Sequence, residues 1–190
     1  MQLMTYLFDR GGPENTDATL EIAAERAKVL GIRQMVVASS HGDTALKAYA
    51  LCAPAGIHLI AITIGHGWEH VGWCMSAEKK AELEALGIDV VVGIHGLGDS
   101  VGSAFTEKHG GRVPEEIVRD TLYRFSQGMK VAVEDIFMAA EAGLLDMSQE
   151  VVSVAGTGSG ADTAIVCKPA YARTFFDLEI REVLAKPRIP

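Results

Sequence analysis

Short runs of apolar, largely β-branched residues recur along the chain, each bounded by glycine, proline or small polar residues. Runs of this kind are typical of buried strands in parallel sheets. In the first half of the chain they lie at 3–8, 35–38, 58–63 and 88–92. The segments between them repeat apolar residues at intervals of three and four, which predicts helices at 16–30, 43–53 and 76–86. This alternation predicts an α/β fold.

The second half continues the alternation with less regular spacing. Helical patterns occur at 97–126, with a break at Gly110–Gly111, and at 129–142. Strands are predicted at 150–154 and 163–167, on either side of a glycine-rich turn. The segment 175–186 fits both a helix and a strand and is left unassigned. Because no repeat, low-complexity run or linker interrupts the pattern, we expect a single α/β domain over residues 1–190.

Composition and charge narrow the functional classes. The 190-residue chain is 48% hydrophobic and 22% charged, which is typical of a globular protein. Its formal net charge of −8 argues against nucleic acid and against an anionic membrane surface as partners. The three cysteines lack a C-x-x-C spacing, as expected for reduced thiols. With no signal-peptide pattern and no apolar run of about 20 residues, the sequence predicts a cytoplasmic protein.

The loop Ser39-Ser40-His41-Gly42-Asp43-Thr44 joins a predicted buried strand to a predicted helix. In open α/β sheets, ligands bind at such loops, beyond the carboxyl ends of the strands. Glycine and small hydroxyl residues let the backbone approach an anion, and the helix start adds free N–H groups and the positive end of its dipole. The loop is therefore a candidate phosphate site. The alternative is an ordinary helix cap, in which Ser40 or Asp43 accepts hydrogen bonds from backbone N–H groups.

A second loop, Gly156-Thr157-Gly158-Ser159-Gly160-Ala161-Asp162-Thr163, separates the two predicted strands of the second half. It is longer than the roughly two to five residues that a hairpin needs. Its glycines leave backbone N–H groups free to form an anion-binding nest. The loop lacks the lysine of a Walker loop, and its glycines have the wrong spacing for a dinucleotide-binding turn. A hairpin tip without a ligand is the alternative interpretation.

The segment Gly65–Cys74 contains His66, Glu69 and His70, which match the H-x-x-E-H pattern of one class of zinc hydrolase. That pattern needs a helix, whereas three glycines and two tryptophans make this segment a poor helix former. We therefore expect no metal. We expect instead a loop over the ligand site, with a tryptophan as a flat stacking surface.

The remaining polar and aromatic residues give little indication of chemistry. Lys130, Glu134 and Asp135 lie close together on a predicted helix and are expected on a solvated face. The aromatic residues at 171–176 are expected in the core or in an interface. No histidine has a serine or cysteine partner at an identifiable nucleophile turn, so we predict no catalytic residue.

Several motifs resemble one known family. The sequence VVASSHGDTA at 36–45 is similar to a strand–loop–helix of the pyruvate kinase C-terminal domain, whose turn has the form T/S-x-S-G-x-[ST]-A. The chain resembles more closely the small stand-alone proteins named after that domain. The motifs shared with them are G-x-E-N-T at 12–16, VVASS-x-GDTA at 36–45 and GADTA at 160–164, followed by P-A at 169–170 and F-F at 175–176. The likeness extends from about residue 9 to residue 188.

This resemblance implies a three-layer α/β/α domain with a mostly parallel sheet. It implies a regulatory rather than a catalytic role, because that domain of pyruvate kinase holds none of the phosphoryl-transfer residues. In many such kinases, the loop that matches Ser39–Thr44 grips a phosphate of an allosteric sugar bisphosphate, and a glycine-rich loop like 156–162 closes over it. The stand-alone proteins are associated with flavin mononucleotide (FMN).

Residue patterns and resemblance together predict binding of a phosphate-bearing small molecule such as FMN, another nucleotide or a sugar phosphate. The expected contacts are Asn15, Ser39, Ser40, Gly42, Asp43, Thr44, Thr157, Gly158, Gly160, Ala161, Asp162 and Thr163. Two other hypotheses stay open. One is an enzyme that uses bound flavin or, through the H-x-x-E-H residues, a metal. The other is a structural module that assembles into oligomers, for which a homo-oligomer is the commonest form.

Overall fold

The computed structural model of the protein describes residues 4–189. Its strands form a seven-stranded sheet in the order β1-β7-β6-β5-β2-β3-β4. Their bounds are β1 (Tyr6–Phe8), β2 (Gln34–Ala38), β3 (His58–Ile64), β4 (Asp89–Gly93), β5 (Val151–Ala155), β6 (Thr163–Lys168) and β7 (Glu179–Pro187). Neighbouring strands are parallel except at β6, which runs antiparallel to both β5 and β7. The predicted α/β fold with a mostly parallel sheet is confirmed.

Helices connect most of these strands. The α-helices within residues 4–189 are α1 (Thr16–Leu30), α2 (Asp43–Cys52), α3 (Ala77–Ala85), α4 (Val101–His109), α5 (Pro114–Leu122) and α6 (Gln127–Glu141). Short 3-10 helices are η1 (Pro13–Asn15), η2 (Ala53–Ala55), η3 (His66–Val71) and η4 (Ala172–Asp177). No helix in this part of the chain combines the length and apolarity needed to cross a membrane.

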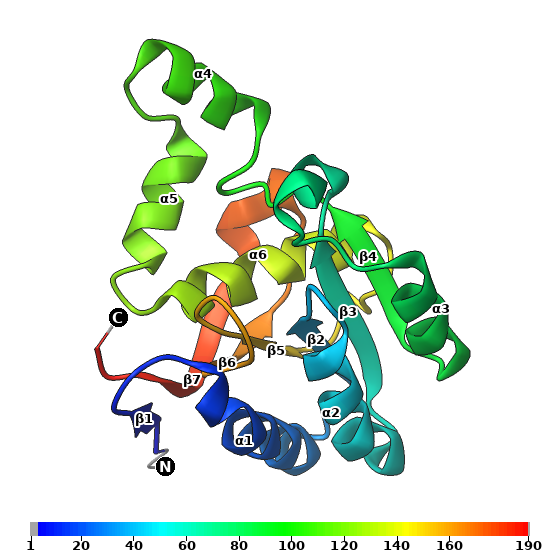
Figure 1. The fold of residues 1–190 in the computed structure, drawn as a ribbon. Helices are drawn as coiled ribbons and strands as arrows, with labels where there is room; N and C mark the ends of the chain where they lie inside the picture. The colour runs from blue at the N-terminus through cyan, green and yellow to red at the C-terminus, as the bar shows by residue number, and fades with distance from the viewer. Residues whose placement is uncertain (1–3, 190) are drawn as a thin grey trace.

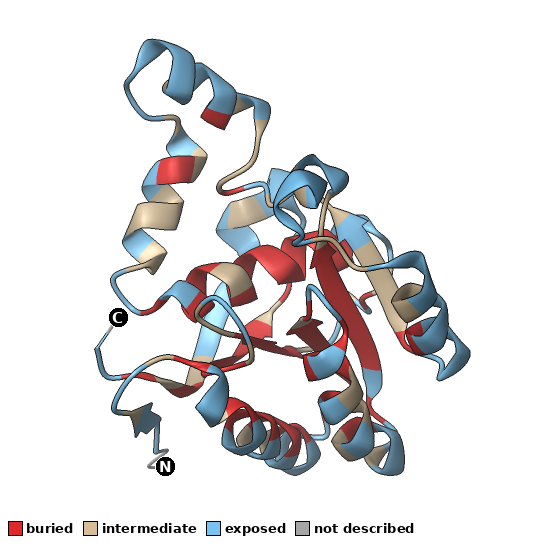
Figure 2. Cartoon of the chain, viewed as in Figure 1, coloured by how far each residue is buried: buried red, intermediate tan, exposed pale blue. Residues whose placement is uncertain are grey.

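The helices cover both faces of the sheet, which gives three layers (Figure 1). On one face, α1 and α2 pack through small residues such as Ala23, Ala27 and Ala48, which let helix and strand approach closely, and α3 packs through Leu83. On the other face, α6 packs through Met129 and Ile136. Figure 2 shows buried residues concentrated between these layers. Burying one large aliphatic side chain contributes about 1.5–3 kcal/mol, so these two interfaces dominate the stability of the fold.

Local capping signals explain where several helices begin and end. Gly31 ends α1 in the left-handed conformation, with φ 71°, which glycine adopts without steric cost. Ser76 and Ser126 precede α3 and α6, and their hydroxyl oxygens accept hydrogen bonds from the backbone N–H groups of Lys79 and Met129. The helix ends predicted from the sequence agree closely with these positions.

The segment left unassigned from the sequence forms the second half of η4 and most of β7. β7 lies between β1 and β6 and pairs with both. Pairing on two sides stabilises the extended conformation, whereas local propensity does not distinguish it from a helix here. The first predicted strand is shorter than expected, because β1 covers Tyr6–Phe8 only, and residue 3 lies outside the described residues.

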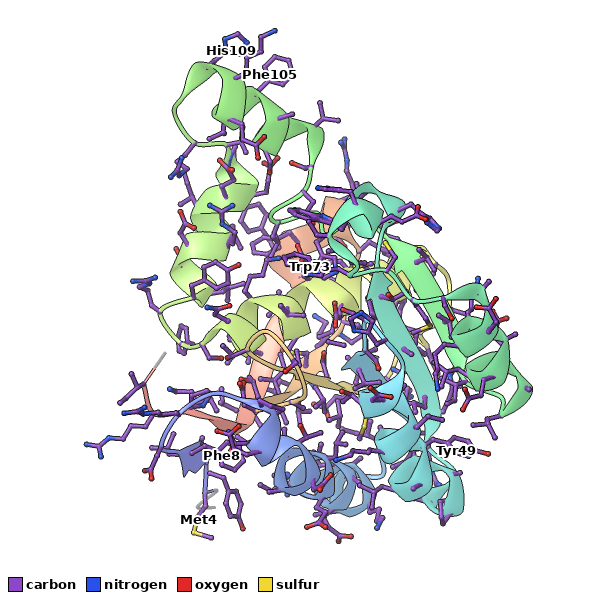
Figure 3. The ribbon with its side chains drawn as sticks, in the orientation of Figure 1. Met4, Phe8, Tyr49, Trp73, Phe105 and His109 are labelled. Carbon is purple, nitrogen blue, oxygen red and sulfur yellow. The ribbon has the colours of Figure 1, made fainter. Side chains whose placement is uncertain are left out.

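Helices α4 and α5 project from the body of the molecule as an arm, residues 101–122 (Figure 1). Most of the arm is exposed (Figure 2). Polar contacts join its helices: the hydroxyl groups of Ser100 and Thr106 donate to Glu115 (2.8 Å) and Glu116 (2.7 Å). Figure 3 shows the side chains of α4 at the outer end of the arm, far from the sheet.

One expectation about the surface is wrong. Lys130, Glu134 and Asp135 do not lie on a solvated face of α6, because they are only 5%, 1% and 0% exposed. The segment after β4 folds over this part of the helix, and the backbone N–H of Leu97 donates to Glu134 at 2.6 Å. The pattern within one helix cannot reveal burial by a distant segment.

The aromatic residues at 171–176 divide between core and surface. The ring of Phe175 packs against that of Phe137 in α6, with 5.8 Å between centroids. Phe176, by contrast, is 96% exposed.

Candidate functional site

Both loops predicted to bind a phosphate lie at the same edge of the sheet. β2 and β5 are adjacent and parallel, with Val37 opposite Val154, so the loops that follow them leave the sheet side by side. β1 is parallel to β7, and its carboxyl end leads at this edge into η1 and α1. Three segments therefore lie at this edge: 11–16, 39–44 and 156–163. This carboxyl edge is where open α/β sheets bind ligands.

The loop between β2 and α2 is fixed by contacts to the neighbouring strand. The backbone N–H of Ser39 donates to the carbonyl of Ile62 (2.8 Å), and the hydroxyl of Thr63 donates to the carbonyl of Ser40 (3.2 Å). The Ser39 hydroxyl oxygen accepts from the backbone N–H of Ala45 in the first turn of α2 (3.1 Å). The loop is thus held in one shape. Ser39 acts in part as a cap, whereas the side chains of Ser40 and Asp43, which the cap interpretation of the sequence named, make no such bond within the described residues.

The first turn of α2 leaves hydrogen-bond donors unused. Among residues 4–189, the backbone N–H groups of Gly42, Asp43 and Thr44 donate to no protein acceptor. The Thr44 hydroxyl has no partner in this part of the chain either, although the residue is only 8% exposed. Its oxygen is not one of the side-chain atoms sealed from solvent, so it faces the outside. A helix start with several free donors attracts an anion.

The glycine-rich loop after β5 is organised around the carboxylate of Asp162. This residue is fully buried, and its Oδ2 accepts from the backbone N–H groups of Gly12 (3.1 Å) and Thr157 (2.9 Å). Its Oδ1 accepts from the hydroxyl of Thr163 (2.8 Å), which also contacts the hydroxyl of Ser126 at 2.9 Å. Asp162 and Thr163 therefore shape the loop, and their polar atoms are already occupied by protein partners.

Close packing also fixes the other side of this loop. The hydroxyl oxygen of Thr16 accepts from the backbone N–H of Ala161 (3.0 Å) and donates to the carbonyl of Pro13 (2.6 Å). Gly160 lies so close that a Cβ there would be 2.4 Å from Thr16 Oγ1 and 2.6 Å from Pro13 Cα. The start of α1 and the loop therefore form a single packed unit.

The predicted site residues differ in burial and in role. Buried residues that hold the loops are Ser39, Ala161, Asp162 and Thr163. Gly42 and Thr44 are also buried, but their donors at the start of α2 have no partner within the described residues. Residues with accessible atoms at the sheet edge are Ser40, Asp43, Thr157, Gly158 and Gly160. Asn15 lies at the start of α1, but its amide nitrogen donates to the carbonyl of Arg10 (2.8 Å). Asn15 thus supports the segment before α1, while its amide oxygen and its second amide N–H remain for a ligand.

The segment 65–74 lies beside the β2–α2 loop, as expected for a cover. His41 Nε2 is 3.0 Å from the carbonyl oxygen of Gly72. The rings of Trp68 and Trp73 stack with 5.0 Å between centroids, and Trp68 Nε1 donates to Asp99 (3.0 Å). Trp73, labelled in Figure 3, is half exposed.

The H-x-x-E-H residues do not form the α-helical face that their pattern requires. They lie in η3, a 3-10 helix of about three residues per turn, in which residues four apart diverge. His66 and Glu69 are 3.8 Å apart, whereas His70 Nδ1 contacts the carbonyl of Gly67 (3.1 Å). Within residues 4–189, no three His, Cys, Asp or Glu side chains are grouped so that they could hold a metal ion.

Two contributors to this edge were not indicated by the sequence. Lys79, in the first turn of α3, lies against Gly42. Gly128, in the first turn of α6, lies against Thr163, since a Cβ there would be 2.4 Å from its Oγ1. Both come from helices far from the loops in sequence, and a short motif cannot reveal such neighbours. The only local signals were Ser76 and Ser126, which indicate where α3 and α6 begin but not what these helices contact.

A separate buried cluster of ionisable groups lies between α6 and the segment after β4. Glu134 accepts from His95 Nδ1 (2.5 Å) and from the ammonium of Lys130. Burial opposes ionisation of Glu134, but the contacts with His95 and Lys130 outweigh it and lower its pKa. Burial likewise opposes the charge on His95, yet the hydrogen bond to Glu134 and the nearby carboxylates raise its pKa. This cluster fastens the base of the arm to α6.

Asp135 belongs to the same cluster but has no partner. Neither of its carboxyl oxygens has a hydrogen bond within the described residues, and the residue is fully buried. Burial raises the pKa of Asp135 to about 8, so the group is protonated at neutral pH.

A groove of about 540 Å³ lies elsewhere, between α1 and the β1–β7 edge of the sheet. Its polar centre is the pair of Arg26 and Glu182, joined by two hydrogen bonds of 2.7 and 2.5 Å. Because the Arg26 guanidinium is already paired with Glu182, the groove offers fewer free donors than the carboxyl edge of the sheet. We therefore take the carboxyl edge as the candidate site.

Comparison with known families agrees with this architecture. Residues 17–167 match the family described as "Pyruvate kinase, alpha/beta domain". The matched range includes the β2–α2 loop, η3, α6 and the glycine-rich loop, and so covers nearly all of the candidate site.

Proposed function

From the premise that the chain belongs to the family of the pyruvate kinase α/β domain, we propose that it binds a phosphate-bearing small molecule at the carboxyl edge of its sheet. The role is that of a regulatory or carrier domain rather than of a catalyst. FMN, another nucleotide and a sugar phosphate are the ligand classes that fit this chemistry.

The observation that supports this proposal most strongly is the set of unused donors at the start of α2. Three consecutive N–H groups, from Gly42 to Thr44, and the Thr44 hydroxyl have no protein acceptor within residues 4–189. Buried or half-buried donors normally find a partner, and a phosphate supplies several acceptor oxygens at once. The helix dipole favours the same charge.

The neighbouring loop supplies a second wall of fixed shape. Asp162 and Thr16 bind the backbone of segment 157–161 and hold the glycines against the start of α1. A loop already held in place loses little conformational entropy when a ligand arrives. The accessible residues Thr157 and Gly158 then face the same edge as the start of α2.

The test combines ligand identification with mutation. Freshly purified protein is scanned for visible absorbance, and any released small molecule is identified by mass. Titrations with FMN and with a hexose phosphate follow. We expect the double variant Ser40→Ala/Thr44→Val to bind about 10- to 100-fold more weakly, because it loses hydroxyl donors to a charged group.

A matched control is the pair Thr121→Val/Ser148→Ala, which removes the same groups from exposed positions on other elements. The control should bind as the wild type does. Equal affinity of the site variant and the control would contradict the site. A wild type that binds neither ligand but assembles into a stable oligomer would favour the structural-module hypothesis. Bound flavin that is reduced by a nicotinamide donor would favour an enzyme.

A further inference from the structure

The side chain of Lys79 lies across the β2–α2 loop. Its Cγ and Cδ are 2.6 and 2.7 Å from the point where a Cβ on Gly42 would lie. Gly42 has φ 93°, in the left-handed region that favours glycine. A side chain at Gly42 would thus face both backbone strain and the stem of the lysine. The bare backbone at this position lets α3 bring a cation over the start of α2.

The Lys79 ammonium is paired within its own helix. It contacts Glu82 at 2.7 Å, one turn further along α3. The hydrogen bond to Glu82, with the charges of Glu82 and Asp43, raises the pKa of Lys79. Lys79 is therefore a full positive charge at neutral pH, set among two carboxylates.

An anion at the start of α2 needs such a cation, because the anion would lie next to the Asp43 carboxylate, whose negative charge repels a phosphate. Two other lysines on these helices are directed to other partners: Lys47 pairs with Asp17 (2.7 Å) and Lys80 with Glu84 (3.7 Å). Lys79 is the one whose stem contacts the loop itself.

The start of α2 also has a donor that points to a ligand independently of Lys79. Thr44 is more than nine-tenths buried, and its hydroxyl has no protein partner within residues 4–189. Because the oxygen still reaches solvent, it faces the same opening as the N–H groups of the turn. Water at this opening serves as the partner of the hydroxyl in the free protein, and an anion that replaces the water gains this donor.

We propose that Lys79 binds the phosphate group of the ligand and that Glu82 competes with this phosphate for the ammonium. The inference rests on the proposed function, since it assigns a cation and a ligand charge to the same site. The lysine stem stays on the Gly42 backbone. Rotation about its last two bonds moves the ammonium from Glu82 to an anion at the α2 N–H groups.

This competition selects the ligand by charge. A phosphomonoester carries nearly two negative charges above its second pKa of about 6, and a phosphodiester carries one. One charge gives no advantage over the Glu82 carboxylate, which already contacts the ammonium. A ligand with a second negative charge attracts the Lys79 ammonium more strongly than Glu82 does. The favoured ligand class is therefore a terminal phosphomonoester.

Inorganic phosphate at pH 8 and dimethyl phosphate are suitable probes, because one is a dianion and the other a monoanion of similar size. Binding to the full chain is followed by NMR, through the backbone amide shifts of residues 42–44. We expect Lys79→Met to weaken phosphate binding about fivefold and to change dimethyl phosphate binding little. Glu82→Gln should tighten phosphate binding about twofold. Lys80→Met, which removes the same charge one residue away, should match the wild type.

The outcomes separate this inference from the proposed function. If phosphate shifts the amides of 42–44 equally in the wild type, Lys79→Met and Lys80→Met, the site stands and the role of Lys79 is wrong. If phosphate does not shift these amides in the wild type, both the site and the inference are wrong. Tighter binding of dimethyl phosphate than of phosphate would overturn the proposed ligand class.

Discussion

The carboxylate of Asp162 accepts a hydrogen bond from the backbone N–H of Gly12, 150 residues earlier in the chain. The same oxygen accepts from the N–H of Thr157, so one buried charge joins the segment before α1 to the glycine-rich loop. Hydrogen bonds to a buried charge are stronger than those between neutral groups. The loop that looks like a flexible tip in the sequence is therefore one of the more constrained parts of the site.

Asp162→Asn should destabilise the protein and loosen this loop. An amide cannot accept at both oxygens' positions, so one of the N–H groups or the Thr163 hydroxyl loses its partner. We expect a loss of about 2–4 kcal/mol in the free energy of unfolding, measured by urea denaturation. Amide hydrogen exchange at residues 156–160 should also become faster. The exposed Asp177→Asn serves as control, and an equal effect of both changes would show that Asp162 does not hold the loop.

Gly160→Ala should lower the free energy of unfolding by more than the left-handed backbone conformation alone explains. Gly160 has φ 66°, and an added Cβ would lie 2.4 Å from Thr16 Oγ1. Gly143 is a matched control, because it has φ 73° and no atom within 4 Å of an added Cβ. Gly143→Ala should cost about 1 kcal/mol from backbone strain, and Gly160→Ala about 1–3 kcal/mol more from the clash. Equal losses in thermal or urea unfolding would contradict close packing at Gly160.

Variants at Gly42 separate the cost of its backbone conformation from the cost of a clash with Lys79. An alanine here faces the left-handed backbone, with φ 93°, and also the stem of Lys79. The double variant Gly42→Ala/Lys79→Ala should recover part of the stability lost in Gly42→Ala, by about 1 kcal/mol, because the stem no longer clashes. Urea denaturation of the two single variants and the double variant measures this coupling. Strict additivity would mean that the lysine moves aside without cost.

Patterns within a short segment predicted much of the fold. The strand runs, Gly31 as a helix stop and the break at Gly110–Gly111 all correspond to observed element ends, because each depends on local backbone preferences. The β2–α2 loop was found for the same reason: its residues are contiguous. The grouping of both loops at one edge follows from the order of the strands, which alternation alone leaves undecided.

Features formed by segments far apart in the chain could not be predicted from the sequence. Lys79 lies on Gly42, and the segment after β4 buries Lys130 and Glu134, but no pattern near these residues indicates either contact. Asp162 looked like a ligand contact, yet its oxygens are taken by backbone N–H groups from two segments. Side chains that hold a loop and side chains that bind a ligand have the same composition, and only their partners distinguish them.

The stability of the protein should fall as pH rises from about 4 towards 8, because of Asp135. Burial raises its pKa to about 8 in the folded state, while the unfolded chain has a value near 3.9. Between these values the unfolded state has released a proton that the folded state keeps. Stability from this group therefore decreases by about 1.4 kcal/mol per pH unit in that window. His95 adds a loss of the same sign, because its pKa is also raised and its charge in the cluster disappears as pH increases.

Asp135→Asn isolates this contribution, because asparagine keeps the shape and the neutral state of the buried acid. We expect the variant to lose little stability at pH 5 and to gain progressively on the wild type up to pH 8, measured by urea denaturation at each pH. The change Glu107→Gln, at an exposed position of α4, should leave the pH dependence of the wild type intact. Parallel curves for the wild type and Asp135→Asn would mean that Asp135 ionises normally. In that case, the His95–Glu134–Lys130 cluster would have to accommodate a second buried negative charge at neutral pH.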